Sequence, residues 1–542
     1  MKRRTFLELA AAGAVGTLAN PASELDASDR LPSPNPNILI VISDQHRTGL
    51  TRRSGYRFDT SPTLDRIAMQ GVAFDAAYGT QPACVPSRTS LLTGRWPHAH
   101  RVRQNSTGSQ AYFREDIFDV LKSKGYKTGL AGKNHTYLQE GKLDFWREYN
   151  DLRGWQPPHP STAVVEFDDW RRKLNFAVSP VATPFPVETQ FAYRIASDAI
   201  DFLNQYGHEP FALEVSFPDP HDPEQVPAPY FDLYPPADLP DRSVGPEALK
   251  QKGFQWQWMR GLQESIYPGY DKQWRRYVSN YLGSLRMLDD QFARLLRHME
   301  TLHLLESTLI VYVADHGDYV MDFGLMRKGV GMPDSLIRIP MVWSGPGVQP
   351  GRHTTSVSIA DVMPTLCEAV GARIPVGVQG RSLWPILQGK NYPADEFRSI
   401  YAEGGFGGLY YDVSDNVPFS VAEFRGIPPY IVPEQDKTFD ELNFVTQSGT
   451  TKMVRMGEWK LIYDMMGYGQ LYNLARDPGE VNNLFNSSET SSQQALLMAE
   501  LLMWTIRTQD SLPEGAYRTK WPENHNWYSP YRHGEAPTAF VP

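Results

Sequence analysis

The sequence predicts an α/β protein built on a doubly wound, mostly parallel sheet. Near-continuous apolar runs such as "NILIVIS" and "STLIVYVA" are typical of strands that are buried on both faces. Helical patterns lie between such runs, and one of them places its apolar residues on a single face, at Tyr277, Tyr281, Leu285, Leu288, Phe292 and Leu295. Because strands alternate with helices, we expect a parallel sheet that binds its ligand at the carboxyl ends of the strands.

Composition restricts the classes of partner. The chain has 542 residues, of which 41% are hydrophobic and 21% charged, as in an ordinary globular protein with ample core. Its formal net charge of −9 argues against nucleic acid or an anionic membrane surface as a general partner. An anion-binding site must therefore be a local basic cluster.

The first residues, 1–30, are predicted to be a signal peptide and linker. "MKRRTFLELAAAGAVGTLAN" has a basic start, a short apolar stretch and small residues at its end, and Arg3 and Arg4 followed by Phe6 and Leu7 resemble a twin-arginine signal. The alternative is an uncleaved N-terminal anchor. The stretch is short for a transmembrane helix and no later segment supplies one, so we expect an exported protein, periplasmic or secreted, without stable membrane insertion.

Four predicted strands end in polar residues that can carry chemistry. A single Asp or His after a strand is usually a cap, a turn residue or a solvated group, so no member is informative by itself. Together they are expected to meet at one edge of the sheet. The strand ends carry, in chain order, Asp44, Gln45 and His46; Lys133 and His135; His221; and Asp315 and His316.

The segment "ACVPSRTSLLTGR", residues 83–95, predicts a short helix that begins near Cys84. Pro86 suits the first turn, and Gly94 ends the helix. Cys84 would then lie at the positive end of a helix dipole, which favours an anion. The alternative is a small buried cysteine that caps a core helix. The other cysteine, Cys367, is expected to be plain core, so no disulfide framework is predicted.

With these residues assembled, the chain resembles the formylglycine-dependent sulfatase family of the alkaline-phosphatase-like superfamily. The resemblance covers about residues 36 to 485, and its most specific parts are "CVPSRTSLLTGR", which matches the C-x-P-S-R signature, and the distant "DHGD". It implies an alkaline-phosphatase-like fold and the conversion of Cys84 to formylglycine (3-oxoalanine) by a formylglycine-generating enzyme. The hydrate of this aldehyde would be the nucleophile that attacks a sulfate ester.

The resemblance also implies a role for each neighbouring residue. A divalent cation would be bound by Asp44, Gln45, Asp315 and His316 together with the modified Cys84, with Asp315 as the base on the hydrate. Other residues would act on the nucleophile and the ester: Arg88 orients the hydrate, Lys133 and Lys328 neutralise sulfate charge, His135 is the base that collapses the sulfated intermediate, His221 is the acid on the leaving oxygen, and Asn105 contacts the nucleophile or substrate.

The metal pattern departs from that of many sulfatases. Many members carry an Asp pair at the first strand and Asp-Asn at the later one, whereas this chain has Asp44-Gln45 and Asp315-His316. The pattern looks more like the choline-sulfatase and phosphonate-monoester-hydrolase branches. Two carboxylates and a softer His nitrogen leave Ca²⁺ as the first expectation and Mn²⁺ as the alternative.

The C-terminal part resembles the small sheet domain of the same family. "TKMVRMGEWKLIYD" predicts an antiparallel hairpin, and we expect a catalytic domain over 36–395 and a small α+β domain over 396–542. An insertion, about residues 222 to 272, and the C-terminal tail carry aromatic residues that either stack on sugar rings or pack their loops: Trp256, Trp258, Trp521, Trp527, Tyr528 and Tyr531.

The sequence thus predicts a metal-dependent sulfuric ester hydrolase that acts on a sulfated small molecule or glycan, with a carbohydrate or aryl alcohol as product. Two alternatives stay open. One is a phosphonate or phosphate ester hydrolase on the same scaffold. The other is an inactive binder of sulfated glycans.

Overall fold

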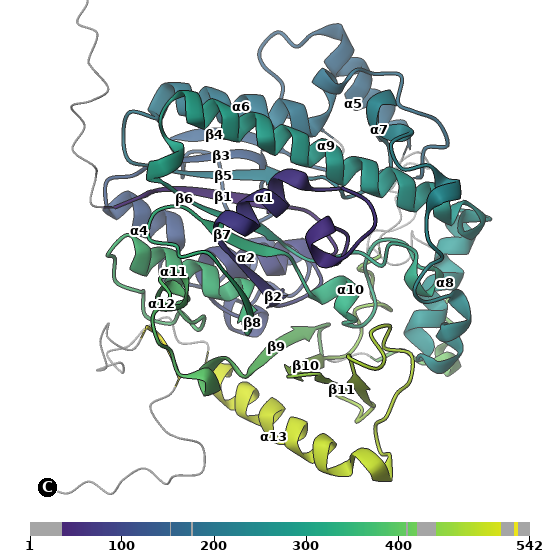
Figure 1. Cartoon of the computed structure of the whole chain (residues 1–542). Helices are drawn as coiled ribbons and strands as arrows, with labels where there is room; N and C mark the ends of the chain where they lie inside the picture. Colours follow the sequence, from purple (N-terminus) through teal and green to yellow (C-terminus); the bar gives the residue numbers. More distant parts are fainter. Residues whose placement is uncertain are drawn as a thin grey trace, which may run out of the picture. The chain divides into compact units, whose positions relative to one another are not determined.

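The computed structural model describes residues 35–151, 153–174, 177–407, 410–419, 441–510 and 525–528. The predicted signal peptide and two of the tail aromatics, Trp521 and Tyr531, lie outside these residues. Within them, the chain forms one large sheet with helices on both faces and a second, smaller sheet (Figure 1).

The large sheet has eight strands in the order β4-β3-β5-β1-β6-β7-β2-β8. β7 is antiparallel to both of its neighbours, and all other pairs are parallel. The strands are β1 (Asn37–Ser43), β2 (Val72–Tyr78), β3 (Lys127–Lys133), β4 (Phe145–Tyr149), β5 (Phe211–Phe217), β6 (Thr308–Ala314), β7 (Met341–Ser344) and β8 (Gly351–Ser358). The four strands that are followed by candidate catalytic or metal-binding residues are thus consecutive in the sheet, in the order β3, β5, β1 and β6.

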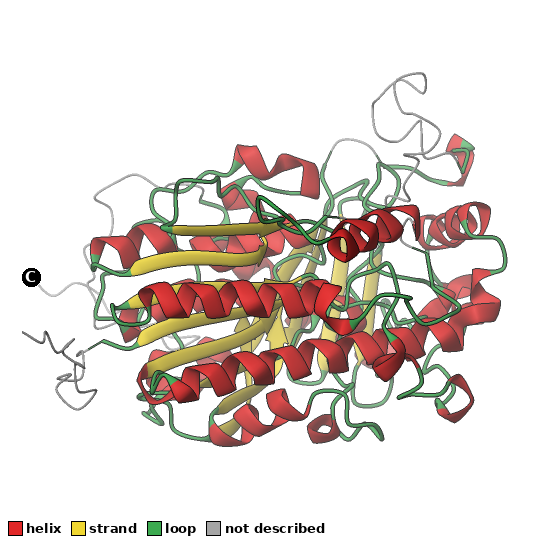
Figure 2. Ribbon diagram, turned by 90° about the horizontal axis from the view of Figure 1, so that it is seen from above, coloured by secondary structure: helices red, strands yellow, loops and turns green. Residues whose placement is uncertain are grey.

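Helices cover both faces of this sheet (Figures 1 and 2). One layer contains α1 (Pro62–Gln70), α6 (Phe191–Tyr206) and the long α9 (Trp274–Thr301), and the other contains α2 (Cys84–Thr93), α4 (Ile117–Ser123), α11 (Val362–Ala369) and α12 (Trp384–Leu387). The remaining α-helices of this part are α3 (Pro97–His100), α5 (Thr162–Leu174), α7 (Ala228–Phe231), α8 (Phe254–Ile266) and α10 (Asp334–Ile337).

Alternation along β1 shows why the strand is apolar throughout. Ile38 and Ile40 belong to the core on the α2 and α11 side, whereas Leu39 and Val41 belong to the core on the α6 and α9 side. Because successive side chains of a strand point to opposite faces, a sheet covered on both sides needs apolar residues at every position. The predicted doubly wound fold is confirmed.

The smaller sheet is antiparallel and contains β9 (Ser399–Gly404), β10 (Thr451–Met456), β11 (Trp459–Asp464) and β12 (Gly469–Asn473), in the order β12-β11-β10-β9. The predicted hairpin is β10 and β11. Met453 packs toward Tyr78 of the large sheet, while its neighbour Val454 faces Trp504 of α13 (Ser491–Thr508). The boundary between 395 and 396 stays a prediction.

The aromatic residues of the insertion do not lie on an extended loop. Trp256 and Trp258 belong to α8, and both are buried. Trp256 contacts the rings of Tyr319 and Phe323, and Trp258 belongs to the same buried cluster, so the structure supports packing for these two residues. No helix among the described residues is long and apolar enough to span a membrane.

Candidate active site

The carboxyl ends of β1, β3, β5 and β6 bring the predicted site residues to one edge of the sheet. Asp44 directly follows β1, Asp315 directly follows β6, and Lys133 is the last residue of β3. All three side chains are fully buried. The convergence expected from the sequence is therefore present in the structure.

Cys84 is the first residue of α2. Ala83 precedes it with extended backbone, and Gly94 ends the helix in the left-handed conformation, at φ 63°. The Sγ atom lies 3.2 Å from Nε2 of His316 and 3.7 Å from Oδ1 of Asp44. Burial, together with the nearby carboxylate of Asp44, raises the pKa of the thiol. An unmodified Cys84 is therefore a neutral thiol in this setting, and a neutral thiol is a poor nucleophile.

Four side chains of the kinds that bind metals form a compact group, called here the metal-type group. Donor atoms of Asp44, Cys84, Asp315 and His316 all lie within 4.8 Å of one another, and all four residues are buried. Nδ1 of His316 lies 2.8 Å from the carbonyl oxygen of Gly317, so a proton on Nδ1 leaves Nε2 free to face the group. Burial lowers the pKa of His316 to about 4, which keeps the ring neutral. This set of donors fits a divalent cation.

Gln45 lies beside this group in a restricted backbone conformation, at φ 67°. Its backbone N–H donates to Oδ1 of Asp315 at 3.0 Å. Its side-chain amide donates from Nε2 to Asp318 at 2.5 Å and accepts at Oε1 from Nζ of Lys328 at 2.9 Å. An ammonium only donates, so the contact with Lys328 fixes the amide oxygen on that side and leaves the amide nitrogen facing Asp318. Its predicted role as a metal ligand stays a prediction.

Arg88 connects the metal-type group to the neighbouring strands. Its Nε donates to Asp315 at 2.7 Å and one terminal nitrogen donates to Asp44 at 3.1 Å. The other terminal nitrogen donates to Ser216 Oγ at 2.7 Å and to the carbonyl oxygen of Lys133 at 2.9 Å. Arg88 thus orders both carboxylates through a planar, fully charged group.

Lys133 carries the charge that balances Asp44. Its ammonium lies 2.5 Å from Oδ2 of Asp44 and also contacts the carboxylate of Asp151. Burial by itself would raise the pKa of Asp44, but Lys133 and Arg88 among its neighbours outweigh that effect and hold the pKa well below its usual value. Asp44 is therefore an anion in the folded protein.

Lys328 contacts both Gln45 and His221. Nε2 of His221 lies 3.3 Å from Nζ of Lys328, and Nδ1 of His221 lies 3.0 Å from the carbonyl oxygen of Asp222. Lys328 also pairs with Oε1 of Glu441 at 3.1 Å. Two potential proton donors thus face the same small volume.

His135 and Asn105 contact neighbours of the site residues. Nε2 of His135 is 4.0 Å from Oδ2 of Asp151, and its side chain is 31% exposed. Partial burial of the ring, together with the charge of Lys133, lowers its pKa and so favours the neutral form. Asn105 accepts a hydrogen bond from the backbone N–H of Val85 at 3.1 Å, which supports the first turn of α2 next to Cys84. The catalytic roles of both residues stay predictions.

Sequence reasoning did not single out four residues that the structure places at this site. They are Asp151, Ser216, Asp318 and Glu441. Asp151 and Ser216 had a usable signal, because Asp151 follows β4 by two residues and Ser216 is near the end of β5. Glu441 had none, because it lies far along the chain and the described residues around it, 441–450, form no strand or helix.

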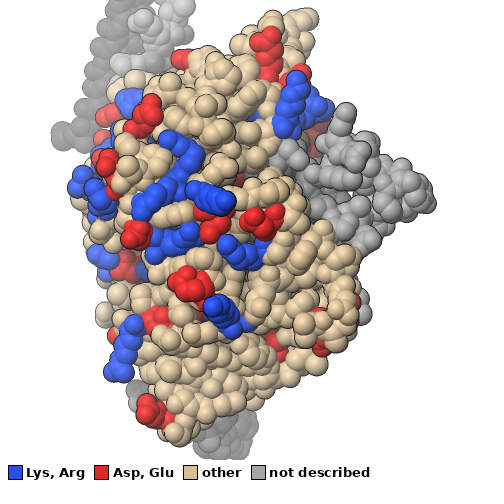
Figure 3. All heavy atoms as spheres, turned by 90° about the vertical axis from the view of Figure 1, so that its right-hand side faces the viewer, with Lys and Arg blue, Asp and Glu red and all other residues tan. Residues whose placement is uncertain are grey.

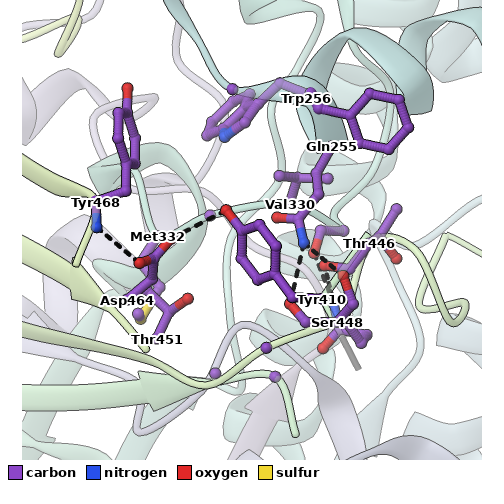
Figure 4. A pocket seen from close by; sticks show the side chains of 18 of the residues that line it. Gln255, Trp256, Val330, Met332, Tyr410, Thr446, Ser448, Thr451, Asp464 and Tyr468 are labelled. Atoms are coloured by element: carbon purple, nitrogen blue, oxygen red, sulfur yellow. Dashed lines mark hydrogen bonds between the residues drawn. The ribbon is translucent and has the colours of Figure 1, made fainter. Parts of the chain in front are cut away.

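A cavity of about 160 Å³ is lined by residues that lie close in sequence to two of the site residues (Figure 4). Its wall includes Pro82, two residues before Cys84, and Gly329, directly after Lys328. Consecutive Cα atoms are about 3.8 Å apart, so the Cα atom of Lys328 lies about 4 Å from a lining residue and that of Cys84 at most about 8 Å from one.

The lining of this cavity is aromatic and acidic. Tyr410 donates from its hydroxyl to Asp464 at 3.1 Å, and the backbone N–H of Tyr468 donates to the same carboxylate at 2.9 Å (Figure 4). Gln255 and Ser448 add polar groups. No Lys or Arg occurs among the lining residues that the structure describes.

Among the described residues, the face shown in Figure 3 has no large patch that consists of Lys and Arg side chains alone. Lys and Arg side chains there are intermingled with Asp and Glu side chains. Because opposite charges alternate, their fields largely cancel at a distance. Within the site, the buried side chains of Arg88, Lys133 and Lys328 form a local basic group of the kind expected for an anion-binding site in a chain of negative net charge.

Comparisons with known proteins agree with this geometry. A family model described as sulfatase matches residues 36–372. The chain is 28% identical to an arylsulfatase of Clostridium perfringens, over 84% of this chain and 91% of that protein. It is 25% identical to a choline-sulfatase of Rhizobium meliloti, over 90% of each. Among solved structures, a phosphonate monoester hydrolase of Agrobacterium radiobacter matches with a TM-score of 0.68 at 22% identity, over 87% of this chain and 96% of that one.

Proposed function

Because the chain belongs to the sulfatase family, we propose that it hydrolyses a sulfate ester at the site around Cys84, with Cys84 converted to formylglycine. The predicted sulfatase activity is confirmed at the level of the family. One observation carries the assignment to this site: Sγ of Cys84 lies 3.2 Å from His316 within a buried group of metal-ligand donors.

The donor set fits the metal that the family implies. Asp44, Asp315 and His316 would hold a divalent cation, with Gln45 and the modified Cys84 completing the set. When bound, the cation would lower the pKa of the hydrated aldehyde and polarise the ester. Ca²⁺ is our first choice because carboxylate and amide oxygens dominate the set, and Mn²⁺ is the alternative because of the His nitrogen.

The protein side chains supply position and charge. Arg88 holds both carboxylates at 2.7 and 3.1 Å, so the anionic ligands keep one geometry while the ester reacts. Lys133 and Lys328 approach the site from β3 and from the loop that follows β6, and they would bind the oxygens of the sulfate group. Asp315 is the base that we assign to the nucleophile, and its contact with Arg88 keeps it deprotonated.

Proton transfer to the departing alcohol is assigned to His221. Its Nε2 faces Lys328 at 3.3 Å, and Nδ1 lies 3.0 Å from the carbonyl oxygen of Asp222. That carbonyl holds a proton on Nδ1, so Nε2 donates to the leaving oxygen when the ring carries both protons. His135 is assigned the later step, in which a neutral imidazole accepts a proton as sulfate is released. Partial burial and the charge of Lys133 lower the pKa of that ring, which favours the neutral form.

We assign the alcohol part of the substrate to the cavity beside Gly329. The cavity beside Gly329 presents the rings of Tyr410 and Tyr468 and the carboxylate of Asp464. Aromatic faces and acceptor oxygens are the groups that bind sugar rings and other neutral alcohols. We therefore favour a sulfated small molecule or glycan whose alcohol part is neutral.

Maturation and export complete the proposal. The twin-arginine pattern at Arg3 and Arg4 favours export of the folded chain to the periplasm or beyond. Conversion of Cys84 requires a formylglycine-generating enzyme before export. The signature "CVPSR" at residues 84–88 is the sequence that supports this partner.

A phosphonate or phosphate ester hydrolase is the second candidate, favoured by Gln45 and His316 in the metal pattern and by the fold shared with a phosphonate monoester hydrolase. One panel tests both: kcat/KM of the matured protein for nitrophenyl sulfate, choline sulfate, a sulfated sugar and a phosphonate monoester, with Cys84→Ala as control. We expect sulfate esters to be turned over and the variant to be inactive. Turnover of the phosphonate alone would favour the second candidate, and binding without any turnover would favour an inactive binder.

A further inference from the structure

Each of the two lysines assigned to the sulfate group already has a carboxylate partner outside the metal-type group. Lys133 contacts Asp151 in addition to Asp44, and Lys328 pairs with Glu441 at 3.1 Å. A lysine with one carboxylate beside it presents less net positive charge to a ligand than a lysine alone. The site therefore has little surplus positive charge for its size.

Asp151 is held at the centre of the ester-binding residues. It follows β4, and Nε of Arg171 donates to its backbone carbonyl oxygen at 3.0 Å. Its Oδ1 lies 4.0 Å from Nδ1 of His221, and its Oδ2 lies 4.0 Å from Nε2 of His135. The carboxylate thus faces three side chains from the ends of two strands, Lys133 and His135 after β3 and His221 after β5.

The carboxylate also remains charged. Burial alone would raise its pKa, but the adjacent ammonium of Lys133 outweighs burial and holds the pKa of Asp151 far below its usual value. A fixed negative charge beside Lys133 repels any anion that Lys133 binds, and the repulsion grows with the charge of that anion.

We propose that Asp151 is a specificity-determining residue that favours monoanionic esters over dianionic ones. The proposal rests on the proposed function in one respect, the binding of the ester anion by Lys133. A sulfate monoester carries one negative charge, as does a phosphate diester. A phosphate monoester acquires a second charge with a pKa of about 6. Asp151 therefore penalises the phosphate monoester selectively at neutral and alkaline pH.

The test compares three esters with the same nitrophenyl leaving group at pH 8. They are nitrophenyl sulfate, methyl nitrophenyl phosphate and nitrophenyl phosphate, and kcat/KM is measured for the wild type and for Asp151→Asn. One unit charge at roughly 5 Å, in the effective dielectric of about 20 that applies to proteins, predicts that the variant improves the phosphate monoester by about 100-fold or more relative to the two monoanions. The sulfate and the diester should change by a common factor.

Two results would overturn the proposal. If all three esters change by the same factor, Asp151 only holds Lys133 in place. If none changes, its charge does not reach the ester. Asp168→Asn is the matched control, because Asp168 is a buried carboxylate that pairs with Arg194 at 2.8 Å rather than with a site lysine. Its substitution should leave the relative rates of the three esters unchanged.

Failure of the proposed function would be visible separately. A wild type that does not hydrolyse nitrophenyl sulfate contradicts the sulfatase assignment, while the comparison of phosphate monoester with diester still tests Asp151. Should Asp151→Asn fail to fold, the wild type supplies a second measurement. Its kcat/KM for the monoester, divided by that for the diester, should fall about tenfold or more between pH 5 and pH 8. A ratio that stays constant would overturn the proposal.

Discussion

The Sγ atom of Cys84 lies 3.2 Å from Nε2 of His316, although the two residues are 232 positions apart in the chain. One is the first residue of α2 and the other follows the strand β6. This contact places the residue with the strongest sequence signature directly in the group of metal-ligand donors. The following predictions test what this arrangement does.

Modification of Cys84 is the first prediction. In protein matured in a host with the modifying enzyme, the peptide that contains Cys84 should be about 18 Da lighter than the thiol form, as expected for the free aldehyde. Cys84→Ala should fold normally and lose turnover, because the variant has no aldehyde to hydrate. Mass spectrometry and steady-state rates measure both. Full activity of a sample that contains only the thiol would contradict the formylglycine assignment.

Removal of a metal ligand is the second. Asp44→Ala or Asp315→Ala should lower kcat/KM by roughly 10² to 10⁴, because each removes a ligand of the proposed cation. Metal content per chain should fall in parallel. Chelation should inactivate the wild type, and added Ca²⁺ or Mn²⁺ should restore it.

The control for this prediction is Asp289→Ala. Asp289 is an equally buried carboxylate that accepts the backbone N–H groups of Thr63 and Leu64 at the start of α1, outside the site. Its loss should change stability and leave the metal content of the folded protein unaltered. A metal-free wild type with full activity would refute the metal assignment.

The third prediction separates a proton donor from a sulfate binder at His221. His221→Ala should slow alkyl sulfates by about 10² to 10⁴ and nitrophenyl sulfate far less, because a good leaving group needs little protonation. The measurement is kcat/KM for esters of graded alcohol acidity. A residue that only binds sulfate would affect every ester equally.

Equal losses across the series would therefore remove the acid role from His221. The role would then pass to Lys328, whose Nζ lies 3.3 Å from Nε2 of His221. In that case Lys328→Ala should show the dependence on leaving group that His221→Ala lacks.

The fourth prediction concerns the smaller sheet. Trp504→Ala should destabilise the protein by about 3–5 kcal/mol, because Trp504 is fully buried, stacks on Tyr401 at 6.0 Å between ring centroids and donates to Ser399 Oγ at 2.8 Å. Urea unfolding measures the loss. Leu502→Ala on the same helix is the control, since Leu502 is 60% exposed and should change stability by less than about 0.5 kcal/mol. Similar losses for both variants would show that Trp504 has no special role in the packing of α13.

Local sequence patterns were sufficient for the central strands and for the start of the signature helix. The apolar run that ends before Asp315 is β6 over Thr308–Ala314, as predicted, and α2 ends at Gly94, as predicted. These elements were predictable because burial on both faces and a left-handed helix end leave local marks in composition. The aromatic insertion was less predictable, because residues such as Trp256 pack equally well on a helix or on a loop.

What the sequence by itself determined is the class of the fold, the family and the set of strand ends that carry chemistry, since each depends on residues that are neighbours in the chain. Only the tertiary structure decided which charged and polar side chains contact one another. Asp151 meets Lys133, Glu441 meets Lys328, and Asp318 orients the amide of Gln45, although none of these pairs is adjacent in sequence. The physical reason is that electrostatic interaction depends on distance and burial in space, and the order of residues along the chain does not encode either directly.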